Sequence, residues 1–213
     1  MTSTRKQEKY LSMWEQSKSA KRRFNNGAFH NRYFVGHGVD IGGKPDPLGQ
    51  YTGVFPRMLS VKTWDIQDGD AQYMHGVPDN HFDFVHSSHC LEHMVDVSIS
   101  LNNWIRITKP GGFLIINVPD EDLYELGQWP SKYNPDHKWT FTIYKKTSWS
   151  PKSVNIMDLI IEFSDRVTAE KIELQRDFFR EALVQQKLDQ TRTPVTECSI
   201  EFILQKHCPS LTE

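Results

Sequence analysis

The 213-residue sequence predicts a single α/β domain with a doubly wound, mostly parallel sheet and helices on both faces. Short apolar runs at residues 38–41, 61–64 and 82–86 are each followed by polar residues or glycine, as β-strands would be. A fourth run, at residues 113–118, is almost continuously apolar, which is typical of a strand buried on both faces. Because helix-like stretches separate these runs, the strands should pair in parallel through crossover helices.

The helix predicted between the third and fourth runs has a regular apolar face. Four residues recur there at i, i+4, i+7 and i+8: Val97, Leu101, Trp104 and Ile105. Asp96 stands where a helix cap is expected. The helix should end at residues 109–112, Lys-Pro-Gly-Gly, because proline cannot continue a helix and glycine permits a turn. Further helices are predicted at residues 154–163 and 177–188, and further strands at residues 167–174 and 198–205.

The N-terminal segment, residues 4–23, is polar and locally basic, with seven Lys or Arg against two Glu. Three apolar residues lie at helical spacing in it: Tyr10, Leu11 and Trp14. This pattern predicts a solvated helix whose aromatic side packs on the domain, or alternatively a mobile lid over a site or a docking arm for an acidic partner. The predicted organisation is a helical lid or arm over residues 1–33 and one domain over residues 34–213.

The composition is that of a soluble globular protein, with 38% hydrophobic residues and a formal net charge of -2. Such a charge supplies no overall positive field for a polyanion, so nucleic acid is an unlikely partner. The three cysteines have no paired spacing, and the first residues have no apolar core of a secretory signal, which favours the cytoplasm. No apolar run approaches the roughly 18 to 20 residues of a membrane span.

The first predicted strand ends in an acidic residue and two glycines. Gly42 and Gly43 would let a ligand approach the backbone closely, and Asp40 offers a carboxylate to a cationic or hydroxyl-bearing group. Ligands of doubly wound sheets bind at this edge, beyond the carboxyl ends of the strands. The stretch lacks the G-x-G-x-x-G of dinucleotide-binding loops and the GK-[ST] of phosphate-binding loops.

Acidic residues also follow the second predicted strand. Asp65 ends this strand, where a carboxylate typically accepts hydrogen bonds from ribose hydroxyls, and residues 69–72, Gly-Asp-Ala-Gln, follow. An Asp-Gly pair is equally what turn chemistry alone selects. Several acids without a basic cluster suit a positively charged nucleoside better than one with phosphates, which points to a sulfonium.

Four segments together resemble the class I S-adenosylmethionine-dependent methyltransferases, in particular the broad methyltransferase-domain group acting on small molecules. They are GVDIGG at residues 38–43, GDAQ at 69–72, FDFVHSSHCLEHM at 82–94 and RITKPGGFLIINVPD at 106–120. The resemblance covers roughly residues 35–120 and implies a Rossmann-like sheet with one antiparallel C-terminal strand. The chain departs from the family at Lys44 and Asp46, where glycines are expected.

The resemblance also implies roles for individual residues. Asp40 and Gly42 would face the methionine part of S-adenosylmethionine, Asp65 the ribose, and Asp70 with Ala71 the adenine ring. Ser88 and His89 would line the channel beside the sulfonium. The implied function is methyl transfer to an oxygen or nitrogen of a small polar metabolite, for example a sugar-like or natural-product acceptor.

Histidines supply the candidate bases and one competing interpretation. His89, and His137 in the loop after the fourth strand, are the candidate catalytic bases, since imidazole titrates near neutral pH. Residues 89–93 also satisfy H-x-x-E-H, so that a helix could hold a zinc ion with Glu92 as general base. Because that motif directly follows a buried strand, no metal is expected, and Glu92 is expected to open the next helix, where it favours the helix dipole.

Three aromatic residues of the same loop are candidate pocket walls, with loop packing as the alternative: Trp129, Tyr133 and Trp139. The rivals to methyl transfer to a small molecule are a catalytically silent protein of the same fold, a zinc hydrolase, and an RNA methyltransferase that uses its basic N-terminal helix. The acceptor and the oligomeric state are not predicted.

Overall fold

The structure is a computed structural model that describes residues 15–209. Its centre is a six-stranded sheet of order β2-β1-β3-β4-β8-β7, in which β8 runs in the direction opposite to the other five strands. This confirms the predicted mostly parallel sheet with one antiparallel C-terminal strand. The strands are β1 (Gly36–Ile41), β2 (Met58–Trp64), β3 (Phe82–Ser88), β4 (Thr108–Pro119), β7 (Val167–Gln175) and β8 (Ser199–Lys206).

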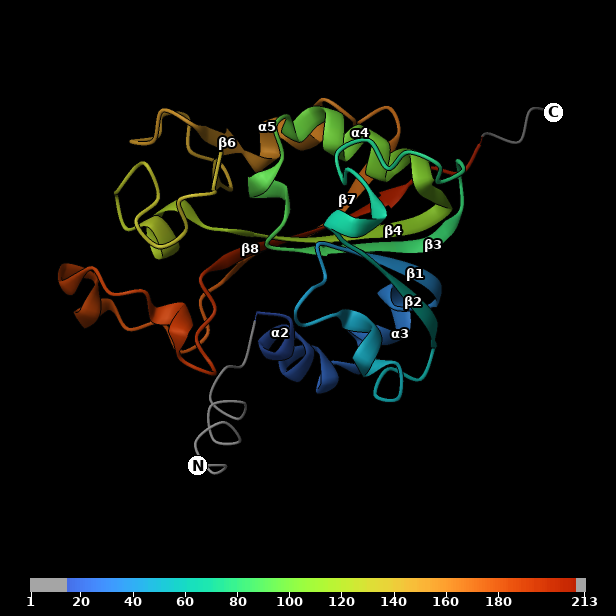
Figure 1. The fold of residues 1–213 in the computed structure, drawn as a ribbon, viewed down its shortest axis with the longest axis horizontal. Coiled ribbons are helices and arrows are strands. Elements are labelled where there is room, and N and C mark those ends of the chain that lie inside the picture. Colours follow the sequence, from blue (N-terminus) through green and yellow to red (C-terminus); the bar gives the residue numbers. More distant parts are fainter. Residues whose placement is uncertain (1–14, 210–213) are drawn as a thin grey trace.

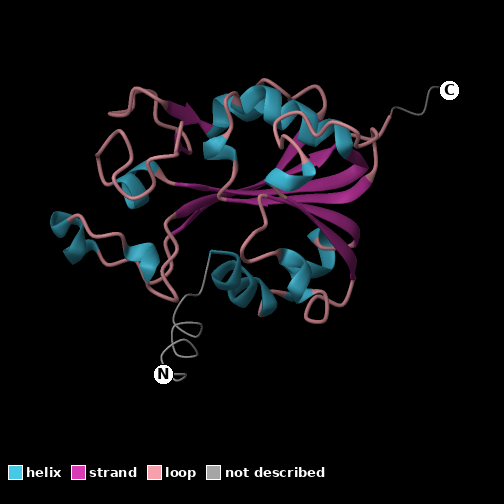
Figure 2. Ribbon diagram, in the orientation of Figure 1, coloured by secondary structure: helices cyan, strands magenta, loops and turns pink. Residues whose placement is uncertain are grey.

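Helices cover both faces of the sheet, as Figures 1 and 2 show. On one face lie α2 (Glu15–Phe24) and α3 (Gly27–Tyr33), and on the other lie α4 (Val97–Ile107) and α5 (Ile156–Ile161). A separate two-stranded sheet is made by β5 (Thr140–Thr142) and β6 (Ser153–Asn155). Short helical turns complete the chain: η1 (Leu48–Tyr51), η2 (Ile66–Asp68), η3 (Leu91–His93), η4 (Glu121–Glu125), η5 (Glu181–Gln186) and η6 (Gln190–Arg192).

The apolar face predicted for α4 is confirmed. Its four repeating residues are all buried in the main core: Val97, Leu101, Trp104 and Ile105. The carboxylate of Asp96 caps the helix by accepting a hydrogen bond from the backbone N–H of Ile99 at 2.8 Å. The helix ends at Ile107, before the Lys-Pro-Gly-Gly stretch, which forms the first part of β4 instead of a separate turn.

Helix α2 packs on the sheet largely through polar side chains. Lys18 and Arg23 are buried, and the Nζ of Lys18 donates to the carbonyl of Thr196 at 3.1 Å. The predicted anchors Tyr10, Leu11 and Trp14 lie outside the described residues. Helix α3 adds Phe29 to a second core cluster. The division into an arm over residues 1–33 and a domain over 34–213 stays a prediction.

The prediction of a helix over residues 177–188 is wrong. That segment forms only the short turn η5, and Phe178 and Lys187 both have positive φ values, which an α-helix does not accommodate. None of its apolar residues is fully buried: Phe179, Leu183 and Val184 are half-buried, Phe178 is 70% exposed and Leu188 is 49% exposed. Helical spacing without a packing surface is not sufficient to form a helix here.

Two other boundaries also differ from the prediction. Helix α5 is shorter than residues 154–163, because residues 153–155 pair in parallel with β5. Glu92 does not open α4, because residues 91–93 form the separate turn η3 and α4 begins only at Val97. Glu92 therefore makes no contact with the dipole of a long helix.

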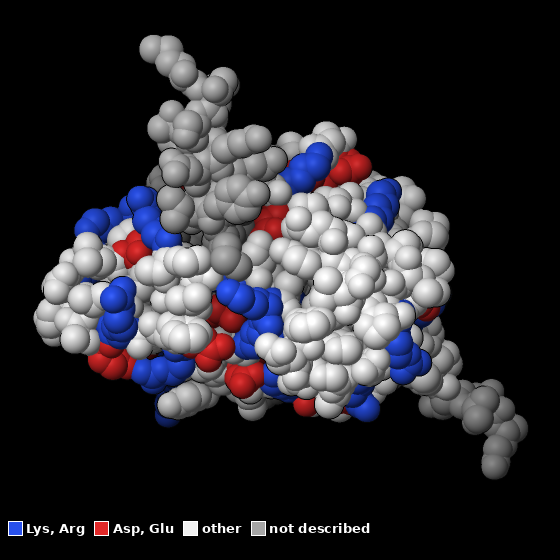
Figure 3. Space-filling model, turned by 90° about the horizontal axis from the view of Figure 1, so that it is seen from below, with Lys and Arg blue, Asp and Glu red and all other residues white. Residues whose placement is uncertain are grey.

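Two further features concern the surface. In the view from below in Figure 3, basic and acidic side chains lie interspersed among uncharged ones. Within residues 15–209, the helices are too short and too polar for any to cross a membrane.

Candidate active site

The cavity that matches the predicted site lies at the carboxyl ends of β1 and β3, next to which the strand order reverses. Its volume is about 280 Å³. It is lined by Glu15, Gln16, Asp40, Gly42, Gly43, Lys44, Pro45, Asp46, Ser88, His89 and Asn134. Five predicted cofactor residues are among them: Asp40, Gly42, Gly43, Ser88 and His89.

A larger hollow of about 730 Å³ lies at the opposite end of the parallel strands, where they begin. It is bordered by the start of β1 at Gly36 and the start of β4 at Lys109. Because doubly wound sheets bind ligands at the carboxyl ends of their strands, we assign the site to the smaller cavity.

Asp40 holds the loop that follows β1. Its Oδ2 accepts a hydrogen bond from the backbone N–H of Leu48 at 2.7 Å, and its Oδ1 lies 2.7 Å from Nδ1 of His86. The carboxylate is 1% exposed. The observed contacts of Asp40 are thus internal, and its predicted contact with the methionine part of the cofactor stays a prediction.

A buried chain of polar and charged groups continues from Asp40 across the sheet to β8. Nη1 of Arg23 lies 3.1 Å from Nε2 of His86, and Nη2 of Arg23 lies 2.6 Å from Oε2 of Glu201. Since a guanidinium only donates, Nε2 of His86 must accept and Nδ1 must carry the proton toward Asp40. Burial lowers the pKa of His86, which favours this neutral form. Burial alone would raise the pKa of Glu201, but Arg23 and Arg22 hold it well below its usual range.

The departure from the family at Asp46 has a structural explanation. Oδ2 of Asp46 accepts hydrogen bonds from both the backbone N–H and the hydroxyl of Ser17, each at 2.7 Å. These contacts fix the first turn of α2 against the loop after β1. A carboxylate at this place is therefore used to position the N-terminal helix beside the cavity.

Gly42 meets a steric requirement that only glycine satisfies. Its φ is +73°, and a Cβ at this position would lie 2.6 Å from Cβ of Cys90. The loop therefore passes closely over the segment that follows β3.

The residues predicted for the ribose and adenine lie next to the cavity, near the end of β2. Asp65 accepts hydrogen bonds from the backbone N–H groups of Lys44 at 3.1 Å and Ile66 at 2.8 Å. Asp70 accepts from the backbone of Gln72, and the carbonyl of Ala71 accepts from Trp104 Nε1, each at 2.8 Å. These contacts order the segment, and the ribose and adenine roles stay predictions.

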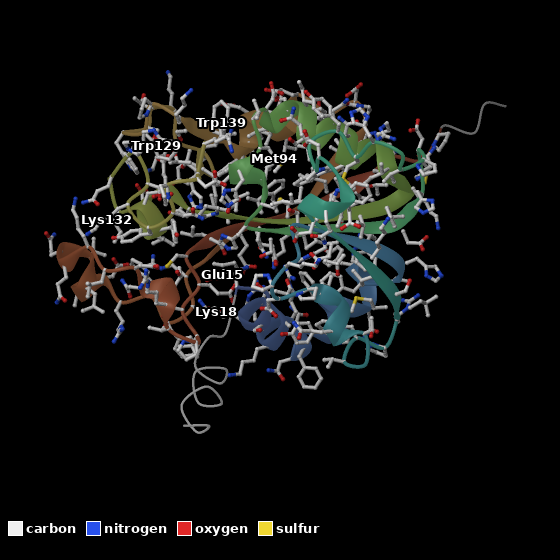
Figure 4. All side chains as sticks on the ribbon, viewed as in Figure 1. Glu15, Lys18, Met94, Trp129, Lys132 and Trp139 are labelled. Carbon is white, nitrogen blue, oxygen red and sulfur yellow. The ribbon has the colours of Figure 1, made fainter. Side chains whose placement is uncertain are left out.

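Sequence reasoning missed the residues that reach the cavity from other elements. Glu15 and Gln16 come from the start of α2, and Asn134 comes from the loop between β4 and β5. In Figure 4, Glu15 and Lys18 lie on the α2 side of the sheet, and Met94 lies on the α4 side. The side-chain amide of Gln16 and the hydroxyl of Ser88 are buried and have no hydrogen-bond partner among the residues that the structure describes. Such groups are available to a polar ligand.

His89 borders the cavity in a strained backbone conformation. Its φ is +54°, and its backbone N–H donates to the carbonyl of Asn117 at 3.0 Å. Its Nδ1 lies 3.6 Å from Oε1 of Glu92, and its Nε2 lies 3.9 Å from Oε2 of Glu15. Burial lowers the pKa of His89, but the two carboxylates outweigh burial and raise it overall.

His137, Tyr133 and Trp139 contact other parts of the fold. His137 is 7% exposed, and its Nδ1 lies 2.8 Å from Oε1 of Glu125. The Tyr133 hydroxyl donates to the carbonyl of Lys187 at 2.7 Å, and Trp139 Nε1 donates to the carbonyl of Met94 at 3.0 Å. Trp129 lies in the same loop, as labelled in Figure 4. None of these four residues is among those that line the cavity within residues 15–209.

The strand order and the position of the cavity define a Rossmann-like methyltransferase fold. Residues 38–116 match the family model described as a methyltransferase domain. Together, this match and the fold support a class I S-adenosylmethionine-dependent methyltransferase with S-adenosylmethionine as the implied cofactor, in agreement with the predicted resemblance.

Solved structures agree with this fold at low sequence identity. A SAM-dependent methyltransferase from Archaeoglobus fulgidus is 18% identical, with a TM-score of 0.57 over 97% of this chain and 100% of that one. An S-adenosylmethionine-dependent methyltransferase from Mesorhizobium loti is 13% identical, with a TM-score of 0.52 over 86% and 97% of the two chains. A putative one from Listeria monocytogenes is 9% identical, with a TM-score of 0.54 over 89% and 100%. No curated protein matches the sequence.

Proposed function

We propose that this methyltransferase acts on an oxygen or nitrogen of a small polar metabolite, such as a sugar-like or natural-product acceptor. The observation that carries the proposal is the polar lining of the cavity. Carboxylates of Glu15 and Asp46, the amide of Gln16 and the hydroxyl of Ser88 border it. Acidic groups favour a positively charged sulfonium, and hydrogen-bonding groups favour a hydroxyl- or amine-bearing acceptor.

The proposed cofactor-binding residues remain those indicated by the family resemblance: Asp40, Gly42, Gly43, Asp65, Asp70, Ala71, Ser88 and His89. Gln16 is added to them because it lines the cavity and its buried side-chain amide has no hydrogen-bond partner among the described residues. A small acceptor is supported by the elements that border the cavity on two sides, the start of α2 and the loop that carries Asn134. A polymer would need a groove with continuous access along its length. The proposed location is the cytoplasm, on the cysteine pattern described above.

S-adenosylmethionine supplies an electrophilic methyl group on a positively charged sulfur. The protein must then hold the acceptor atom about 3 Å from this carbon and in line with the breaking bond. His89 is the proposed catalytic base because it lines the cavity. His137 is the second candidate, and it would require an acceptor that reaches past His89 into the loop.

Calorimetric titration with S-adenosylhomocysteine tests the cofactor residues. Loss of one hydrogen bond to the ligand in Gln16→Ala or Asp65→Ala should weaken binding by about tenfold, equivalent to about 1.4 kcal/mol. Gln67→Ala is the matched control, because Gln67 is exposed and does not line the cavity. If wild-type protein bound no S-adenosylhomocysteine, the catalytically silent alternative would be favoured.

A transfer assay with labelled S-adenosylmethionine tests the acceptor and the base. Small hydroxyl- and amine-bearing compounds should accept the label, and RNA should not. Steep salt dependence of RNA binding with labelling of RNA would replace the proposal by the RNA methyltransferase alternative. Loss of a general base in His89→Ala should lower kcat by about 10²- to 10⁴-fold. Full activity in both His89→Ala and His137→Ala would show that neither acts as a base.

A further inference from the structure

A cluster of imidazole and carboxylate groups lies beside the cavity, in the turn after β3. Nε2 of His93 and Nε2 of His137 each lie 3.9 Å from Oε1 of Glu92. One ligand atom from each of these three residues lies within 4.8 Å of the others. Two residues come from η3 and the third from the loop before β5, so only the folded chain brings them together.

Glu92 is the unusual member of the cluster. Its side chain is fully buried, and within the described part of the chain neither carboxylate oxygen has a hydrogen-bond partner. A buried carboxylate that lacks such partners is costly, because water no longer solvates its charge. Its surroundings therefore favour a cation between Glu92 and the two imidazoles.

The Nδ1 atoms of His93 and His137 face carboxylates other than that of Glu92. Nδ1 of His137 lies 2.8 Å from Oε1 of Glu125, and Nδ1 of His93 lies 3.1 Å from Oδ2 of Asp136. If each Nδ1 carries the proton, each Nε2 presents its lone pair toward Glu92. Histidines that bind metals through one nitrogen usually donate the other N–H to a carboxylate or carbonyl in this manner.

We infer that Glu92, His93 and His137 bind one divalent first-row transition-metal ion. Two imidazoles and one carboxylate are a ligand set that Zn²⁺ and related ions accept, with coordination positions left open. Metal–ligand distances of about 2.0 to 2.2 Å place tetrahedral ligand atoms about 3.4 Å apart. Each Nε2 therefore needs to approach Oε1 by about half an ångström. The ligand atoms of the two histidines, which lie within 4.8 Å of each other, need to approach by at most about 1.4 Å, and side-chain torsions can provide both movements.

The site differs from the zinc motif visible in the sequence. The H-x-x-E-H spacing pairs His89 with His93 on one helix and leaves Glu92 as a base. In the structure residues 91–93 form a short turn. In the inferred site Glu92 is a ligand instead of a base, and His137 takes the place of His89 as the second imidazole. This ligand set was not recognised in the sequence, because His137 is distant along the chain.

His89 connects the metal site with the methyl-transfer cavity, because it borders both. The role of this metal ion in the reaction rests on the proposed function. An open coordination position would bind the hydroxyl of the acceptor. In the transfer, the acceptor oxygen bonds to the methyl carbon as the carbon–sulfur bond breaks. The hydroxyl proton passes to His89 or to solvent, and S-adenosylhomocysteine leaves as a neutral thioether.

The metal site is tested by binding, without any acceptor. Full-length protein treated with a chelator is titrated with Zn²⁺ by calorimetry and with Co²⁺ by visible absorption. Wild-type protein should bind one ion per chain, and His93→Ala and His137→Ala should weaken binding by more than 100-fold. Glu125→Gln, which changes the partner of His137, should weaken it by about 10- to 100-fold. His81→Ala is the control, because His81 is exposed and outside the cluster.

His93→Ala is the decisive variant because His93 is partly exposed and its replacement should not prevent folding. Equal Zn²⁺ affinity in His93→Ala, His81→Ala and wild type would overturn the inference, as would the absence of binding by wild type. In either case protonated histidines would be left to neutralise Glu92. Titration with S-adenosylhomocysteine on the same samples separates this result from failure of the proposed function.

Discussion

Replacing Arg23 with methionine tests the buried chain of charges that links α2 to the loop after β1. Arg23 is fully buried, and its guanidinium contacts Oε2 of Glu201 at 2.6 and 3.2 Å and Nε2 of His86 at 3.1 Å. Breaking a buried ion pair by removing one partner costs about 3 to 5 kcal/mol. Glu201 keeps Arg22 and Lys171, each at 3.2 Å, so we expect the lower end, about 3 kcal/mol.

Such a loss should lower Tm by roughly 6 to 12 °C, at about 2 to 4 °C per kcal/mol for a chain of this size. It should also weaken S-adenosylhomocysteine binding, because His86 loses the contact that orients it toward Asp40. Arg32→Met is the matched control, since the side chain of Arg32 is 53% exposed and its pair with Glu170 lies at the surface. That pair should contribute at most about 1 kcal/mol.

Urea unfolding at several pH values adds a second readout. The pKa of Glu201 is depressed in the folded protein, so its stabilising contribution is present above the ordinary value of 4.5 and is lost as the pH falls. The difference in stability between wild type and Arg23→Met should therefore shrink below about pH 4. A cost at neutral pH no greater than that of Arg32→Met would refute this account of the buried pair.

Two further predictions concern residues near the site. Burial raises the pKa of Asp120 from 3.8 to about 6, so wild type should lose up to about 3 kcal/mol of stability as the pH rises from 4 to 7. Urea unfolding of Asp120→Asn should not show this loss. The same dependence of stability on pH in both proteins would contradict the prediction. In Gly43→Ala the new Cβ would lie 2.3 Å from Oδ2 of Asp40, so calorimetry should show weaker S-adenosylhomocysteine binding and unfolding should show a loss of about 1 to 3 kcal/mol of stability. A Cβ at Gly53 would have no atom within 4 Å, so Gly53→Ala should show neither effect. Equal binding and stability of the two variants would exclude the clash.

Residues that line the cavity could be predicted from sequence where they directly follow a predicted strand. Gly42, Gly43 and His89 follow strands whose apolar runs are visible in the chain, and parallel strands bring their carboxyl ends to one edge. Gln16 could not be found in this way, because nothing in its own neighbourhood along the chain places α2 beside that edge. Asp46 departs from the family pattern, and only its contact with Ser17 explains the departure.

By itself the sequence determined the strands of the sheet, the α4 helix with its Asp96 cap, and the loop glycines. These features depend on periodicity and backbone conformation, which act over a few residues. The tertiary structure alone decided that Arg23 pairs with Glu201 and that His137 faces Glu92 and His93. Burial and contacts between distant segments determine how strongly charged groups attract each other and how well side chains can bind a metal ion. Both depend on the whole fold.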